Sequence, residues 1–113
     1  SRINVGAMGV GLASRALDEA VEYAKVRQQF GKPIANLQAI QMIIADIAMQ
    51  TEAARQLVYH TAELVDAKMP YSKYASMSKC MGGDIAMKVS IDALQVLGGF
   101  GYMKEYPLEK IST

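Results

Sequence analysis

Apolar and small side chains recur every three or four positions over three long stretches of the chain, which is the spacing of one helix face. The first stretch predicts an amphipathic helix from residue 2 to about residue 29. The second predicts a helix that Asn36 caps and that runs to about residue 68. The third predicts a helix that Ser72 caps and that reaches about residue 97. The second stretch has the most regular seam: Leu37, Ile40, Ile44, Ile47, Thr51, Ala54, Val58, Ala62 and Val65.

Three long helices joined by short turns predict an all-α fold, the up-down-up portion of a four-helix bundle. The last segment, residues 105–113, is too short for a matching fourth helix. Apolar residues occur on two sides of the third stretch, so we expect that helix to be buried on both. We therefore expect residues 1–113 to be one domain, truncated at its C-terminal end. Its open apolar groove would pair with another copy or with the rest of a longer protein.

Glycines mark both ends of this arrangement. Gly98 and Gly99 are expected to end the third helix, because glycine tolerates the left-handed backbone of a helix stop. Gly6, Gly9 and Gly11 superficially resemble a nucleotide-binding glycine run, but no strand precedes them. They are expected to allow one helix to pack closely on another.

Composition excludes several classes of protein. With 113 residues, of which 51% are hydrophobic, the chain suits one folded domain rather than a disordered segment. Its net charge is +1, from 12 basic and 11 acidic residues, and it has no basic stripe for nucleic acid. No apolar run is long enough to span a membrane, and no leader pattern is present.

Two potentially reactive side chains occur once each. Cys80 cannot form an internal disulfide, which fits a reducing compartment, and its apolar neighbours suggest a small core residue. His60 has no partners at ligand spacing, so no metal site is expected, and it should lie on the flank of the second helix.

The corner at residues 27–34, RQQFGKPI, is the strongest candidate for chemistry. Arg27 falls in the last turn of the first predicted helix, and Gly31 and Pro33 then stop that helix. A planar cation beside the ring of Phe30 could hold a phosphate next to a flat base. The alternative is a purely structural corner.

A second stretch makes the pattern more specific. QVLGGFGY at residues 95–102 and EYPLEK at 105–110 follow the corner in the chain. In this order and at this separation, the chain resembles the C-terminal domain of the acyl-CoA dehydrogenases, FAD enzymes that desaturate acyl thioesters. The resemblance runs from residue 2 to residue 110, essentially the whole chain.

The resemblance implies that the corner binds FAD across a subunit interface. Arg27 would contact the pyrophosphate, and Gln29 would contact the same phosphates where many relatives have Thr or Ser. Phe30 would pack beside the adenine, and Gln38 would approach the flavin nucleotide. Each of these roles is implied by the family and not by the residue pattern alone.

Further roles follow from the same resemblance. Gln95, with Gly98 and Gly99, would touch the ADP part of FAD from the neighbouring subunit, where glycine allows the backbone to approach a ligand. Arg2 matches an arginine near the entrance to the acyl-CoA site. Ser1 stands where the isovaleryl and long-chain branches carry their catalytic glutamate. Other branches carry it beyond the end of this chain, so no catalytic residue is expected here.

The implied whole enzyme oxidises an acyl-CoA in fatty acid β-oxidation. A carboxylate takes the α proton and flavin N5 accepts the β hydride, giving a trans-2-enoyl-CoA. Electrons then pass to an electron-transferring flavoprotein. The family also implies a homodimer or homotetramer in the bacterial cytoplasm or the mitochondrial matrix. The chain itself would supply cofactor binding and a subunit interface.

Two other functions remain compatible with the sequence. The chain could be a stand-alone helical association module that has the scaffold but no flavin. It could also belong to a related acyl-CoA oxidase, in which reduced flavin reacts directly with oxygen. The length of the acyl chain cannot be read from these residues.

Overall fold

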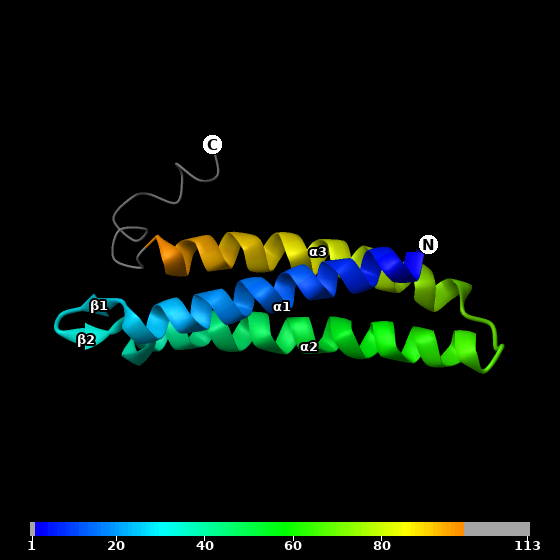
Figure 1. The fold of residues 1–113 in the computed structure, drawn as a ribbon, viewed down its shortest axis with the longest axis horizontal. Helices are drawn as coiled ribbons and strands as arrows, with labels where there is room; N and C mark the ends of the chain where they lie inside the picture. The colour runs from blue at the N-terminus through cyan, green and yellow to red at the C-terminus, as the bar shows by residue number, and fades with distance from the viewer. Residues whose placement is uncertain (1, 99–113) are drawn as a thin grey trace.

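The chain folds into three long helices that lie side by side (Figure 1). The computed structural model describes residues 2–98, with side chains from residue 4 onward. In this part of the chain, α1 spans Arg2–Val26, α2 spans Gln38–Asp66 and α3 spans Ser72–Leu97. Helices α1 and α3 run in the same direction and α2 runs against both. The predicted all-α class and up-down-up arrangement are confirmed.

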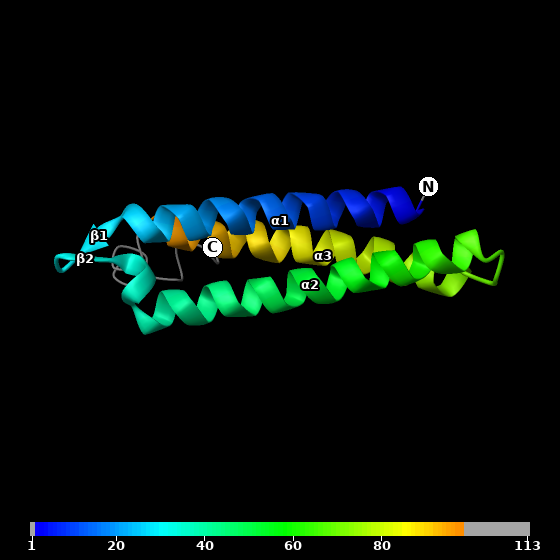
Figure 2. The same cartoon turned by 60° about the horizontal axis from the view of Figure 1, so that its bottom comes forward.

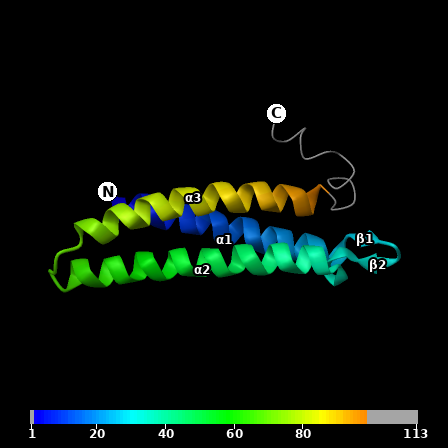
Figure 3. The same cartoon turned by 180° about the vertical axis from the view of Figure 1, so that it is seen from behind.

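A small hairpin and one 3-10 turn connect α1 to α2. Strand β1 (Gln28–Gln29) pairs antiparallel with β2 (Lys32–Pro33), and the 3-10 helix η1 (Ile34–Asn36) follows. Figures 1 and 3 show the hairpin extending beyond the helices at the end opposite the N-terminus. The C-terminal end of α3 lies at this same end of the bundle, while the connection from α2 to α3 lies at the other.

Glycines bring the backbones of α1 and α3 into close contact in the N-terminal half of α1. A methyl group added to Gly9 would collide with the backbone of Gly82, and one added to Gly82 would lie 2.7 Å from the carbonyl oxygen of Gly6. Close helix packing is therefore confirmed for Gly6 and Gly9. It is wrong for Gly11, which is exposed and has nothing within 4 Å of an added methyl group.

Two clusters of buried apolar side chains hold the helices together, and all three helices contribute to each. The cluster in the middle of the bundle consists of Val10, Ala13, Ile47, Ala54, Val58, Ile85 and Val89. The cluster toward the hairpin consists of Ala20, Ala24, Ile34, Ile40, Ala93 and Val96. Most of the predicted seam of α2 is buried, from Ile40 to Val58, but its last member, Val65, is exposed at the end of the helix. Figure 2 shows α1, α3 and α2 in a view rotated from the first.

The predicted start and end of the helices around the corner need correction. Helix α1 ends at Val26 and not near residue 29, because the chain turns into β1. Asn36 does not cap α2: it ends η1, which closes as the amide of Leu37 donates to the carbonyl of Ile34 at 2.9 Å. Leu37 then takes the N-cap position, with no side-chain hydrogen bond to the helix.

The predicted ends of α3 also differ from those observed. Ser72 is the first residue of the helix, and Tyr71 occupies the N-cap position without a side-chain hydrogen bond. Gly98 ends the helix with φ −77° and ψ −6°, so it does not adopt the left-handed backbone that was expected. Its amide donates to the carbonyl of Leu94 at 2.8 Å, which continues the helical pattern. Gly99 lies outside the described residues.

Candidate functional site

The predicted corner is a tight hairpin with Phe30 and Gly31 at its tip. Gln28 pairs with Pro33 and Gln29 pairs with Lys32, so the turn contains only two residues. Both have positive φ, 58° for Phe30 and 77° for Gly31, as hairpin turns of the primed type require. Glycine adopts this conformation freely, but phenylalanine does so at a cost. The ring of Phe30 is nevertheless 86% exposed, so packing within this chain does not offset that cost.

This strained position gives a direct stability prediction. Phe30→Gly is expected to raise the free energy of unfolding by roughly 0.5–1 kcal/mol, because the backbone strain disappears and no buried contact is lost. Phe30→Ala is the matched control: it removes the same ring but keeps a side chain at positive φ, so no gain is expected. Urea unfolding of the three proteins measures the difference. A Phe30→Gly protein less stable than the Phe30→Ala protein would contradict the account.

The backbone of Arg27 is fixed from both sides. Its amide donates to the carbonyl of Tyr23 at 2.9 Å, and its carbonyl accepts from the amide of Ile34 at 2.7 Å. Ile34 is 1% exposed within the apolar cluster toward the hairpin, so the root of the hairpin is anchored in the core. The side chain of Arg27 is exposed at the surface beside the hairpin. Within residues 4–98, no carboxylate lies within ion-pair distance of this guanidinium.

The other candidate residues have the following places. Gln29 is half-buried in β1, and Gln38 is exposed as the first residue of α2, just after η1. Gln95 is half-buried in the last turn of α3, and Gly98 follows that helix. The hairpin and the end of α3 thus lie at one end of the bundle (Figure 3).

Three positions cannot be placed in the same way. Arg2 begins α1 at the opposite end of the bundle, and its side chain is outside the described part. Ser1 and Gly99 lie outside the described residues altogether.

Sequence reasoning missed one residue beside the corner. Tyr23 lies one helical turn before Arg27, and its hydroxyl accepts a hydrogen bond from Arg27 Nη1 at 3.2 Å. The signal was present, because residues four apart in a helix lie on the same face. In sequence alone, that tyrosine looks like an ordinary member of an amphipathic helix.

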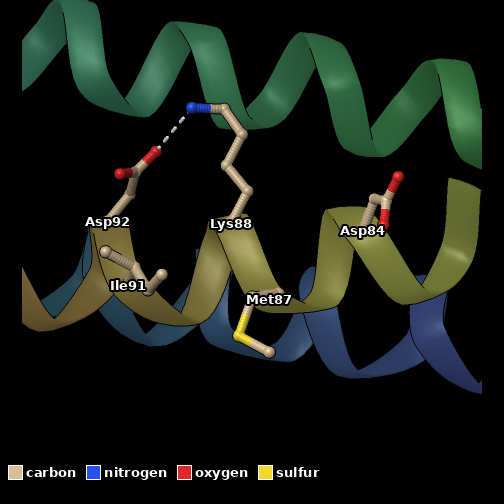
Figure 4. A pocket seen from close by; sticks show the side chains of 5 residues that line it. All are labelled: Asp84, Met87, Lys88, Ile91 and Asp92. Carbon is tan, nitrogen blue, oxygen red and sulfur yellow. Dashed lines mark hydrogen bonds and ion pairs between the residues drawn. The ribbon is translucent and has the colours of Figure 1, made fainter.

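An open depression on the surface of α3 is lined by polar and apolar side chains of that helix (Figure 4). Its volume is about 380 Å³, and its lining is Asp84, Met87, Lys88, Ile91 and Asp92. Lys88 Nζ lies 3.0 Å from a carboxylate oxygen of Asp92 and 3.0 Å from one of Asp46 on α2. Lys88 is therefore paired with Asp92 on its own helix and with Asp46 on α2.

These contacts favour the charged forms of Lys88 and Asp46. Hydrogen bonds to Asp46 and Asp92 raise the pKa of Lys88. Hydrogen bonds from Gln50 and then from Lys88 lower the pKa of Asp46. Both groups consequently stay ionised near neutral pH. This pattern fits a pair that links two helices better than a proton-transfer site.

The expectation that α3 is buried on two faces is wrong for one of them. Met87 and Leu94 are 65% and 66% exposed, and Ile91 is also exposed. Cys80, on the same line, is exposed and not in the core as predicted. This line points away from the contact with α1, because Ile85 and Val89 occupy the face of α3 that packs in the core.

The remaining candidates show no catalytic cluster. His60 is exposed on α2, as expected, and makes an edge contact with the ring of Tyr74 at 5.0 Å. Within residues 2–98, no three histidine, cysteine or acidic side chains come together to hold a metal ion. In the same residues, no helix is both long and apolar enough to cross a membrane.

Comparisons with known proteins give one consistent family. The model of the acyl-CoA dehydrogenase C-terminal domain matches residues 1–113. An acyl-CoA dehydrogenase of Bacillus subtilis is 49% identical over 110 residues, which are 97% of this chain and 29% of that protein. The caffeyl-CoA reductase–Etf complex subunit CarC of Acetobacterium woodii is 47% identical over 110 residues, again 97% of this chain and 29% of the relative.

A solved structure agrees with the sequence matches. Butyryl-CoA dehydrogenase from Megasphaera elsdenii superimposes with a TM-score of 0.85 at 45% identity, covering 96% of this chain and 28% of that one. The chain thus spans less than a third of the length of the proteins that it matches.

Proposed function

Because the chain belongs to the acyl-CoA dehydrogenase family, as its C-terminal domain, we propose that it forms the FAD-binding and oligomerisation domain of such an enzyme. The proposed domain spans residues 1–113. That enzyme oxidises an acyl-CoA to a trans-2-enoyl-CoA. The observation that carries the proposal is the hairpin, which has an exposed Phe30 at positive φ at its tip and, at its root, an exposed Arg27 that no carboxylate neutralises among the described residues.

The chemistry of the hairpin fits FAD, the cofactor of the family. A guanidinium offers a planar set of donors that can bind two phosphate oxygens, and an exposed ring can stack on adenine. A backbone conformation that costs energy without a packing gain is typical of a functional position. The arrangement therefore supports Arg27 at the pyrophosphate and Phe30 at the adenine.

Other residues are assigned by the resemblance to the family, and of these Gln29, Gln38, Gln95 and Gly98 belong to elements that meet at the hairpin end of the bundle. Gln29 would donate its amide to the same phosphates, and Gln38 would lie near the flavin nucleotide. Gln95, Gly98 and Gly99 of a neighbouring subunit would contact the ADP part. Arg2 would help to place the acyl-CoA at the entrance of the substrate site.

In the full-length enzyme, bound FAD supplies the hydride acceptor. This chain holds and orients it, and the carboxylate base comes from elsewhere in the protein. An electron-transferring flavoprotein is the proposed electron partner, in keeping with the Etf complex that the Acetobacterium woodii relative is named for. The proposed location is the bacterial cytoplasm or the mitochondrial matrix, and the proposed assembly is a homodimer or homotetramer.

A second candidate function is the reverse reaction, reduction of an enoyl-CoA. It is favoured by one specific observation, since the relative from Acetobacterium woodii is a caffeyl-CoA reductase subunit at 47% identity. The hairpin would bind FAD in the same way for either direction.

The test is to purify the full-length enzyme and to mix it, without oxygen, with a series of saturated acyl-CoA thioesters. The flavin absorbance is expected to bleach with at least one chain length and to return when an electron-transferring flavoprotein is added. A full-length protein without flavin would overturn the proposal in favour of the association module. Hydrogen peroxide formation in air would indicate the oxidase, and bleached flavin that only an enoyl-CoA reoxidises would indicate the reductase. Residues 1–113 alone are expected neither to hold FAD tightly nor to turn over.

A further inference from the structure

The hydroxyl of Tyr23 is the only side-chain partner of Arg27 among the described residues. Arg27 Nη1 donates to it at 3.2 Å, one turn back along α1. We infer that Tyr23 is a positioning residue, which holds the Arg27 guanidinium in the orientation that binds the pyrophosphate of FAD. This inference rests on the proposed function of Arg27, and it assigns to Tyr23 a role beyond packing.

Tyr23 is suited to this role because its own ring is held in place. The ring is half-buried and packs against the apolar cluster toward the hairpin, which includes Ala24 and Ile34. The hydroxyl stays at the surface, where it meets Arg27. A tyrosine has few rotatable bonds, so a packed ring presents its hydroxyl at a defined point.

The hydrogen bond to Tyr23 restricts the guanidinium, which is the part of the Arg27 side chain that would otherwise rotate freely. Its backbone amide and carbonyl are already fixed by Tyr23 and Ile34. An exposed arginine side chain still loses rotamer freedom when it binds a ligand, and a contact already made in the free protein reduces that loss. The hydrogen bond uses one donor at Nη1, so Nη2 and Nε remain for an anion. The Tyr23 hydroxyl thus orients the guanidinium and leaves Nη2 and Nε free to donate to phosphate.

The experiment measures the dissociation constant of FAD from the full-length apoenzyme by fluorescence titration, for a cycle of four proteins. These are the unmodified enzyme, Tyr23→Phe, Arg27→Ala and the double variant. Tyr23→Phe keeps the ring and its packing and removes only the hydroxyl. It is expected to raise the dissociation constant about five-fold, because the guanidinium would then lose rotamer freedom on binding, with an unchanged melting temperature of the apoenzyme. In the Arg27→Ala background, the same substitution is expected to change nothing.

Each outcome decides the inference. An unchanged dissociation constant for Tyr23→Phe, with a weakened Arg27→Ala enzyme, overturns the positioning role and leaves the proposed function intact. A five-fold loss that persists in the Arg27→Ala background also overturns it, because the hydroxyl would then act independently of Arg27. An Arg27→Ala enzyme that binds FAD normally overturns both the inference and the proposed FAD contact. A parallel fall in melting temperature and affinity for Tyr23→Phe would show a structural role instead.

Discussion

An alanine in place of Gly9 is expected to destabilise the bundle by about 3 kcal/mol or more, enough to unfold a marginally stable domain. The added methyl group would collide with the backbone of Gly82 on α3. A backbone cannot rotate aside as a flexible side chain can, so α1 and α3 would have to separate. Separation would open the buried contacts of Val10 and Ala13, which follow Gly9 on α1.

The chain offers a matched control for this prediction. Gly11→Ala places the same methyl group two residues further along α1, where nothing lies within 4 Å. Alanine is preferred over glycine inside a helix, so this variant is expected to gain up to about 1 kcal/mol. Thermal and urea unfolding of both variants measures the contrast. Equal stabilities would show that the close contact between α1 and α3 does not exist in solution.

The second large effect is expected at the hairpin, for FAD binding to the full-length enzyme. Arg27→Ala should weaken FAD binding about 100-fold, because hydrogen bonds to a charged group contribute roughly 1.5–3 kcal/mol. The FAD affinity of Arg27→Lys should fall between those of the unmodified enzyme and Arg27→Ala, since a lysine keeps the charge and loses the planar fork. Fluorescence titration of the apoenzyme with FAD measures all three proteins. Neither variant should change the melting temperature of the apoenzyme, because the Arg27 side chain is exposed.

Arg15→Ala controls for the loss of a surface charge. Arg15 is an exposed arginine on the same helix, three turns before Arg27. Its removal should leave FAD affinity within about two-fold, since its charge is screened by salt at that separation. If Arg15→Ala and Arg27→Ala weakened FAD equally, a general charge effect would replace the specific contact at the hairpin.

The helices could be predicted because their signal is distributed over many residues. In α2, the buried positions Ile40, Ile47, Ala54 and Val58 follow the helical spacing, and no single residue decides the pattern. The ends of the helices depend on single residues, and there the prediction was wrong. Asn36 and Ser72 are good capping residues, but Leu37 and Tyr71 occupy the N-cap positions of α2 and α3.

Burial on α3 shows a second limit of sequence reasoning. The line that contains Cys80 and Met87 is apolar, so the sequence predicted burial, yet both side chains are exposed in this chain. Periodicity identifies an apolar face but does not say what covers it. The FAD-binding roles of Arg27 and Gln95 remain predictions, because they depend on a cofactor and a second subunit.

The hairpin could be anticipated only in part. Gly31 and Pro33 correctly predicted a tight turn after α1. The positive φ of Phe30 could not be read from the sequence, since a phenylalanine at that position normally indicates an extended or helical backbone. The interaction of Tyr23 with Arg27 likewise depends on rotamers that residue spacing alone does not fix.

The close contact of Gly6 and Gly9 with the backbone of α3 fixes the position of α1 near its N-terminal end. Gly9 lies 18 positions before Arg27, which at 1.5 Å per residue is about 27 Å along a continuous helix. A tilt of about 5° at this contact would therefore swing the hairpin by roughly 2 Å. On the proposed function, changes near residues 6–9 that leave the protein folded are therefore expected to weaken FAD binding at the far end of α1. Such lesions would be recognised by flavin loss that excess FAD in the growth medium or buffer partly corrects.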